Sequence, residues 1–170
     1  ALRTDLEHPG HRTAQRRLQD IKFLGELFNF RIIGTNVVLG ALAQLLFYFP
    51  HASGAHDYSR IRAFCLMIEC SLRYLLPKPT SRAGRANKGA FAVAKCLQTL
   101  VVHFYRYVQT RAKPVPHDID FRLSECVSAI TAALKPRGAA VDFPPTLAKA
   151  DALLAKYGVG ARARDAGPSG

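Results

Sequence analysis

The sequence predicts an all-α fold, with HEAT-like antiparallel helical hairpins stacked as a short α-solenoid. Apolar residues recur at helical three-and-four spacing in six segments, and no segment alternates convincingly with the period of two that a strand requires. The chain of 170 residues, with 49% hydrophobic and 21% charged side chains, can bury a sizeable core, and this composition excludes wholesale disorder.

The first hairpin is expected to begin near His11. Its first helix should run from His11 to Asn29, with Gly34 as its stop and Thr35 as the N-cap of a second helix, Asn36 to Phe49. The buried stripe of the first helix is predicted to be Leu18, Ile21, Leu24, Leu27 and Phe28, and the polar stripe Gln15, Gln19, Lys22 and Glu26. The second helix is apolar nearly all round, so neighbours should enclose it. Its length of about 21 Å is too short to cross roughly 30 Å of hydrocarbon, so no membrane contact is expected.

The other hairpins are expected to begin near Asp57 and Asp118, and spacings of roughly 45 to 60 residues suit HEAT-like helical pairs. Asp57 should cap the third helix, a basic loop from Pro77 to Gly89 precedes the fourth, and Pro145 suits the first turn of the sixth. We expect an N-terminal extension at 1–10 that is the end of a preceding helix, a helical-repeat domain at 11–158 and a disordered tail at 159–170.

The positive charge is unevenly spread along the chain. Lys and Arg number 24 against 12 Asp and Glu, which gives a formal net charge of +12. From Cys70 to His117 there is no acidic residue, and this stretch attracts phosphate or acidic peptide if its charges gather on one surface. A solvated surface of a basic protein is the other interpretation. The candidate RNA-binding residues are Arg73, Lys78, Arg82, Arg85, Lys88, Arg106, Arg111 and Lys113.

The sequence offers no constellation typical of an enzyme. Gly84 to Gly89 has the glycine spacing of a Walker loop, but Ala90 and Phe91 stand where Lys and Ser or Thr are required. No HExxH frame or nucleophile elbow is present, so no metal, no cofactor and no small-molecule substrate is expected. The four cysteines, Cys65, Cys70, Cys96 and Cys126, have no zinc or redox spacing and lie in apolar runs, which is typical of buried free thiols.

Glu26 is the most informative single residue, because it is an acid on the polar stripe of an otherwise basic segment. One interpretation is an i,i+4 ion pair with Lys22, which stabilises a helix by a few tenths of a kcal/mol. The other interpretation is a contact with a basic partner. The pattern alone leaves both open.

The first helix carries a resemblance to a known family. Gln15-Arg16-Arg17 followed by Lys22 to Arg31 (KFLGELFNFR) resembles the QRR…KFLGELYNYR helix of the family named after the middle domain of initiation factor four-G (MIF4G-like). Four further segments match the family in the same order along the chain. Arg60-Ile61-Arg62 with Cys65 resembles RIRLVC, and Phe104–Val108 resembles YFQRYV. Pro116–Phe121 resembles PIDIDY, and Leu134–Pro136 resembles LRPK. These later matches single out the third such domain of the scaffold of nonsense-mediated mRNA decay.

The resemblance implies a HEAT-like α-solenoid that binds partners and has no catalysis of its own. It implies docking of the RRM-like domain of up-frameshift protein three, contact with other decay-complex proteins, and a cytoplasmic location, with a perinuclear one as the alternative. In the family an acidic face takes basic residues of the partner, and Glu26 matches the acidic position. Asp20, Lys22 and Asn29 join it by proximity on the same helix. An RNA-binding helical module that uses residues 70–117 remains the alternative function.

Overall fold

In the computed structural model the helices form two layers. The structure describes residues 11–47, 57–76, 88–139, 141 and 143–156. The elements are α2 (His11–Asn29), α3 (Thr35–Phe47), α4 (Ser59–Leu75), α5 (Lys88–Gln109), α6 (His117–Leu134), the 3-10 turn η1 (Lys135–Arg137) and α7 (Leu147–Lys156). Within these ranges no strand occurs, so the all-α prediction is confirmed.

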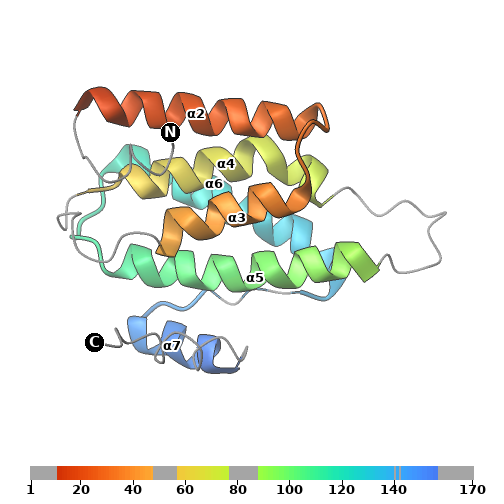
Figure 1. Ribbon diagram of the computed structural model, residues 1–170. Helices are drawn as coiled ribbons and strands as arrows, with labels where there is room; N and C mark the ends of the chain where they lie inside the picture. Colours follow the sequence, from red (N-terminus) through yellow and green to blue (C-terminus); the bar gives the residue numbers. More distant parts are fainter. Residues whose placement is uncertain (1–10, 48–56, 77–87, 140, 142, 157–170) are drawn as a thin grey trace, which may run out of the picture.

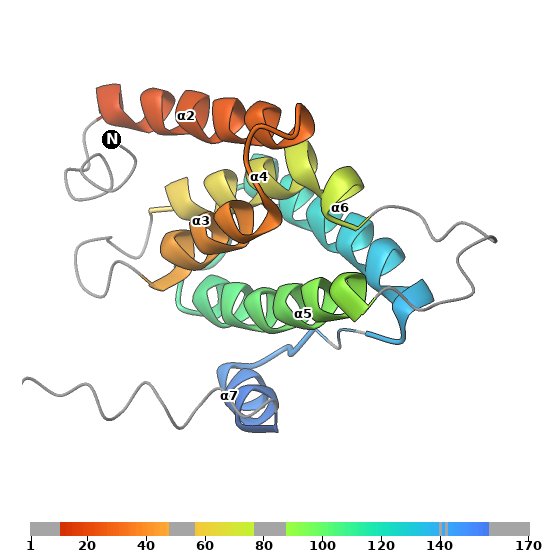
Figure 2. The same cartoon turned by 45° about the vertical axis from the view of Figure 1, so that its right-hand side comes forward.

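Helices that are two apart in the chain stack on each other. The first layer contains α2, α4 and α6, and the second contains α3, α5 and α7. From α2 to α6, consecutive helices run in opposite directions, as Figure 1 shows, which is the antiparallel arrangement expected from the sequence. The last helix, α7, packs chiefly on α5, and in Figure 2 it lies at the end of the stack. Among the described helices, α2 packs on α3 and α4, and α7 packs chiefly on α5.

The core lies where α4 and α5 meet. Phe64 and Phe104 are almost fully buried, and their rings stack with centroids 4.0 Å apart and an interplanar angle of 10°. α4 and α5 together contribute half of the buried apolar side chains of this core. At the edge of the core Arg62 of α4 donates a 2.6 Å hydrogen bond to Asp118 of α6 in an ion pair that is exposed to solvent.

The reversal after α2 takes place at Arg31, so the prediction that Gly34 stops this helix is wrong. Arg31 has a φ of 60°, and its N–H donates to the carbonyl of Phe28 at 2.9 Å. The N–H of Ile32 donates to the carbonyl of Leu27, also at 2.9 Å. This pair of bonds is a Schellman motif, in which the left-handed position is usually glycine. Here the left-handed position carries an arginine.

The structure also tests the two predicted helix N-caps. The carboxylate of Asp57 accepts a 2.9 Å hydrogen bond from the N–H of Ser59 at the start of α4, but the N-cap residue is Tyr58, so Asp57 lies one residue before the predicted cap position. Thr35 is already the first residue of α3 and therefore lies one residue inside the predicted cap. The predicted turn at 50–56, most of the basic loop at 77–89 and the two terminal segments lie outside the described residues.

The expectation that α3 is enclosed is wrong, because Val37 and Phe47 are 48% and 54% exposed. α3 contacts α2, α4 and α5, and its remaining face is open. One cysteine also departs from prediction: Cys65 and Cys126 are buried and Cys70 is half-buried, but Cys96 is exposed on the outer face of α5. In the part of the chain that the structure describes, no helix is long and apolar enough to cross a membrane.

Candidate partner-binding face on α2

The glycine of the KFLGELFNFR segment sets the distance between α2 and α4. A Cβ added to Gly25 would lie 2.6 Å from the Cβ of Cys70, much closer than any real contact of this kind. Glycine is therefore the residue that lets α2 pack directly on the α4 backbone at this point. The close approach brings the next residue, Glu26, to the seam between the two helices.

Glu26 and Lys22 are both exposed on α2, one helical turn apart. They form no ion pair with each other or with another described residue, so the i,i+4 interpretation is not supported. Both act on the half-buried thiol of Cys70. Burial raises the pKa of Cys70, the negative charges of Glu69 and Glu26 raise it further, and Lys22 lowers it.

Two exposed acids that the sequence analysis did not select, Glu69 of α4 and Glu125 of α6, lie on the other helices of the first layer. Glu69 of α4 lies near the same Cys70 thiol as Glu26, and Glu69 and Glu125 of α6 line one cavity. All three carboxylates are exposed, and none forms an ion pair with another described residue. We call Glu26, Glu69 and Glu125 the acidic strip. It crosses all three helices of the first layer, although the chain as a whole is strongly basic.

Two exposed aromatic side chains flank Glu26 on α2. Phe23 precedes Glu26 by three residues and is 64% exposed, and Phe30 follows it by four residues and is 75% exposed. This spacing places all three on one face of the helix. The sequence contained a signal for this exposure, because neither phenylalanine belongs to the predicted buried stripe.

The other two residues predicted on this face, Asp20 and Asn29, lie differently. Both are half-buried, and Oδ2 of Asp20 and Oδ1 of Asn29 are enclosed without a hydrogen-bond partner. Asp20 lies six residues before Glu26, which is about 120° around the helix. The exposed face of α2 therefore includes Lys22, Phe23 and Glu26, and Phe30 continues it in the turn directly after the helix.

The predicted RNA-binding residues do not form one surface. Arg73 is at the end of α4, Lys88 begins α5, and Lys78, Arg82 and Arg85 lie outside the described residues. The remaining three, Arg106, Arg111 and Lys113, lie near or just beyond the opposite end of α5. This helix has 22 residues and is therefore about 33 Å long.

These three basic side chains make local contacts there. Arg106 donates from Nε to Asp151 of α7 at 2.6 Å, and the Arg111 guanidinium lies 4.4 Å from the ring centroid of Tyr107. Lys113 donates to Gln109 at 3.0 Å. Among the described residues no group of His, Cys, Asp and Glu could hold a metal ion.

Comparison with known proteins adds a distant relationship. No family model matches the sequence. The chain is 26% identical over 130 residues to the regulator of nonsense transcripts UPF2 of Arabidopsis thaliana, which covers 73% of this chain and 10% of that protein. It is also 26% identical over 136 residues to the regulators of nonsense transcripts 2 of Mus musculus and Homo sapiens, with 71% of this chain and 10% of those proteins covered.

The chain is distantly similar to UPF2. It spans about a tenth of the length of these curated relatives. The all-helical, antiparallel structure agrees with the fold that the resemblance to the MIF4G-like family implied.

Proposed function

We propose that this chain is a non-catalytic scaffold domain, covering residues 11–158, of the type found as the third MIF4G-like domain of UPF2. It acts in the cytoplasm in nonsense-mediated mRNA decay and docks the RRM-like domain of up-frameshift protein three. Its other partners are further proteins of the decay complex. The observation that carries the proposal is the exposed carboxylate of Glu26, which forms an ion pair with no described residue and lies between two exposed phenylalanines, Phe23 of α2 and Phe30 directly after it.

The charge of the face suits a basic partner. A carboxylate without an internal ion pair is available to accept charge-assisted hydrogen bonds from Lys or Arg. Glu69 and Glu125 extend the same sign of charge along the layer, so the acidic strip presents a local negative surface on a chain whose net charge is +12. Like-charge repulsion from the rest of the chain then disfavours a basic partner in any other position.

The aromatic side chains of the face supply the apolar part of the interface. Phe23 and Phe30 keep most of their surface in water in the isolated chain. Covering aromatic side chains is a dominant source of affinity at protein interfaces, and a charged group beside them fixes register and orientation. We therefore expect Phe23, Glu26 and Phe30 to act together.

The decisive experiment is calorimetric titration of the chain with the RRM-like domain of up-frameshift protein three at about 0.15 M salt. Glu26→Arg should weaken binding, since loss of one charge-assisted contact of about 1.5–3 kcal/mol corresponds to about 10- to 150-fold in Kd. Asp151→Asn is the control, because Asp151 is an exposed acid on α7 at the far end of the other layer. Unchanged affinity of the Glu26 variant, with an unchanged circular dichroism melt, contradicts the proposal.

RNA binding is the second candidate function, and one local arrangement favours it. The guanidinium of Arg73 lies 5.8 Å from the ring centroid of the exposed Tyr74, which is a suitable platform for a stacked base. Tyr74 and Arg31 line a cavity of about 440 Å³ at the α2–α3 turn. An oligoribonucleotide titration should then show a log–log salt slope of about −0.7 per phosphate contacted. Arg73→Glu should make that slope flatter.

A further inference from the structure

A pair of free cysteines lies between α4 and α6, away from the outer face of α2. Cys65 belongs to α4 and Cys126 to α6, they are 4% and 6% exposed, and the two helices pack against each other. Both side chains face the same space between the two helices. They are 61 positions apart in the chain, so only the stacking of the first layer brings them together.

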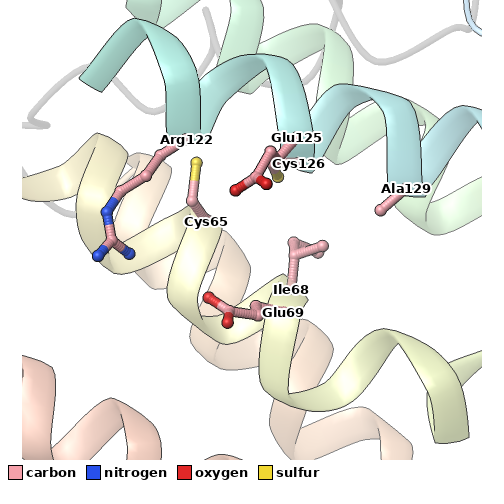
Figure 3. A pocket seen from close by; sticks show the side chains of 7 residues that line it. All are labelled: Cys65, Ile68, Glu69, Arg122, Glu125, Cys126 and Ala129. Carbon is pink, nitrogen blue, oxygen red and sulfur yellow. The ribbon is translucent and has the colours of Figure 1, made fainter. Parts of the chain in front are cut away.

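Both cysteines line a cavity of about 270 Å³ that reaches the surface. Its other lining residues include Ile68 and Ala129 and three exposed charged side chains, Glu69, Arg122 and Glu125. Figure 3 shows the two sulfur atoms in the space between the helices, with the charged side chains around them. A water molecule occupies about 30 Å³ of liquid volume, so a small oxidant of similar size can enter.

We propose that Cys65 and Cys126 are a latent redox site, a dithiol that hydrogen peroxide converts into a disulfide joining α4 to α6. In the first step one thiol attacks peroxide, which gives a sulfenic acid and releases one water. In the second step the other thiol attacks the sulfenic sulfur, the S–S bond forms and a second water leaves. The two thiols together lose two protons and two electrons, and peroxide is reduced to two waters.

The surroundings keep the pair reduced until an oxidant is supplied. The neighbouring Cys65 thiol and burial raise the pKa of Cys126, and the negative charge of Glu69 raises it further. The thiolate is the reactive form, so this environment makes oxidation slow. The other two cysteines are internal controls for thiol oxidation, because Cys70 is half-buried on α4 and Cys96 is exposed on α5.

The test uses the double variant Cys70→Ser with Cys96→Ser, which retains only the proposed pair. The folded protein is treated with hydrogen peroxide, remaining thiols are alkylated in denaturant, and the peptides are mapped by mass spectrometry without reduction. We expect a Cys65–Cys126 linked peptide from monomeric protein, two fewer alkylated thiols, recovery by dithiothreitol, and a thermal midpoint raised by several degrees. Adding Cys126→Ala must abolish the link and the shift.

Two results overturn the proposal. One is that Cys65 and Cys126 of the wild-type chain remain alkylatable after a peroxide treatment that oxidises Cys96. The other is that the linked peptide forms only together with loss of helical circular dichroism, because the bond would then require unfolding and not the packed layer. A wild-type link between Cys65 and Cys70 would equally contradict the pairing.

Discussion

Replacing Gly25 with alanine should separate α2 from α4. The added Cβ would lie 2.6 Å from the Cβ of Cys70, whereas ordinary contacts of this kind are 3.4–4 Å. Both atoms are fixed to the backbone, so no change of rotamer can relieve the overlap. The two helix backbones must move apart by about 1 Å, in an interior that is packed as closely as an organic crystal.

The expected loss of stability follows from two opposing terms. Overpacking of this kind costs about 1–3 kcal/mol, and alanine gains up to about 1 kcal/mol over glycine inside a helix. The net result should be a destabilisation of about 1–2 kcal/mol. Gly40 of α3 is the matched control, because a Cβ there meets no atom within 4 Å, so Gly40→Ala should stabilise by about 0.5–1 kcal/mol.

The assay is urea unfolding followed by circular dichroism, arranged as a double-mutant cycle. Cys70→Gly removes the opposing Cβ and should restore part of the stability of Gly25→Ala. Cys70→Ala keeps that Cβ and should restore almost none of it. If Gly25→Ala stabilises the chain as much as Gly40→Ala does, the close packing of α2 on α4 is refuted.

Three further predictions concern the core and the α2–α3 turn. Arg31→Gly should stabilise the chain by about 1 kcal/mol, because glycine adopts the left-handed conformation without strain; an unchanged urea midpoint would contradict this. His103 is enclosed with an unpaired Nε2, and burial followed by the charge of Arg106 lowers its pKa below 6.5. The unfolded chain therefore binds the proton more readily, so stability should fall as pH drops through 6.5 towards the folded pKa, and His103→Leu should reduce this slope of melting temperature against pH. Phe64→Ala removes the ring stacked on Phe104 and should cost about 3–5 kcal/mol in urea unfolding, and a loss below 1 kcal/mol would be inconsistent with its burial.

Much of the fold was predictable because helical periodicity is a local property. The residues from His11 to Asn29 form the helix that their apolar spacing indicated, and Asp57 accepts a hydrogen bond from the N–H of Ser59 at the start of α4. The turn after α2 was not predictable in the same way. Glycine is the usual left-handed residue, so Gly34 was chosen, but the geometry of the turn places Arg31 in that position.

The candidate site was predicted only in part. Glu26 was selected from its position on the polar stripe, and it is exposed as expected. Phe23 and Phe30 were not assigned to this polar stripe, because apolar side chains are more often buried in a core. Their exposure depends on which side of α2 packs against the other described helices, and no local pattern contains that information.

By itself, the sequence determined the helices and the apolar spacing within them, because both depend on residues within a few turns of one another. The tertiary structure alone decided that Glu26, Glu69 and Glu125 form one acidic strip and that Cys65 and Cys126 share a cavity. The basic stretch shows the converse: it is continuous in sequence, but the length of α5 divides it between two ends of the molecule. Stacking of alternate helices decides which distant residues become neighbours, and that stacking depends on the packing of the whole core.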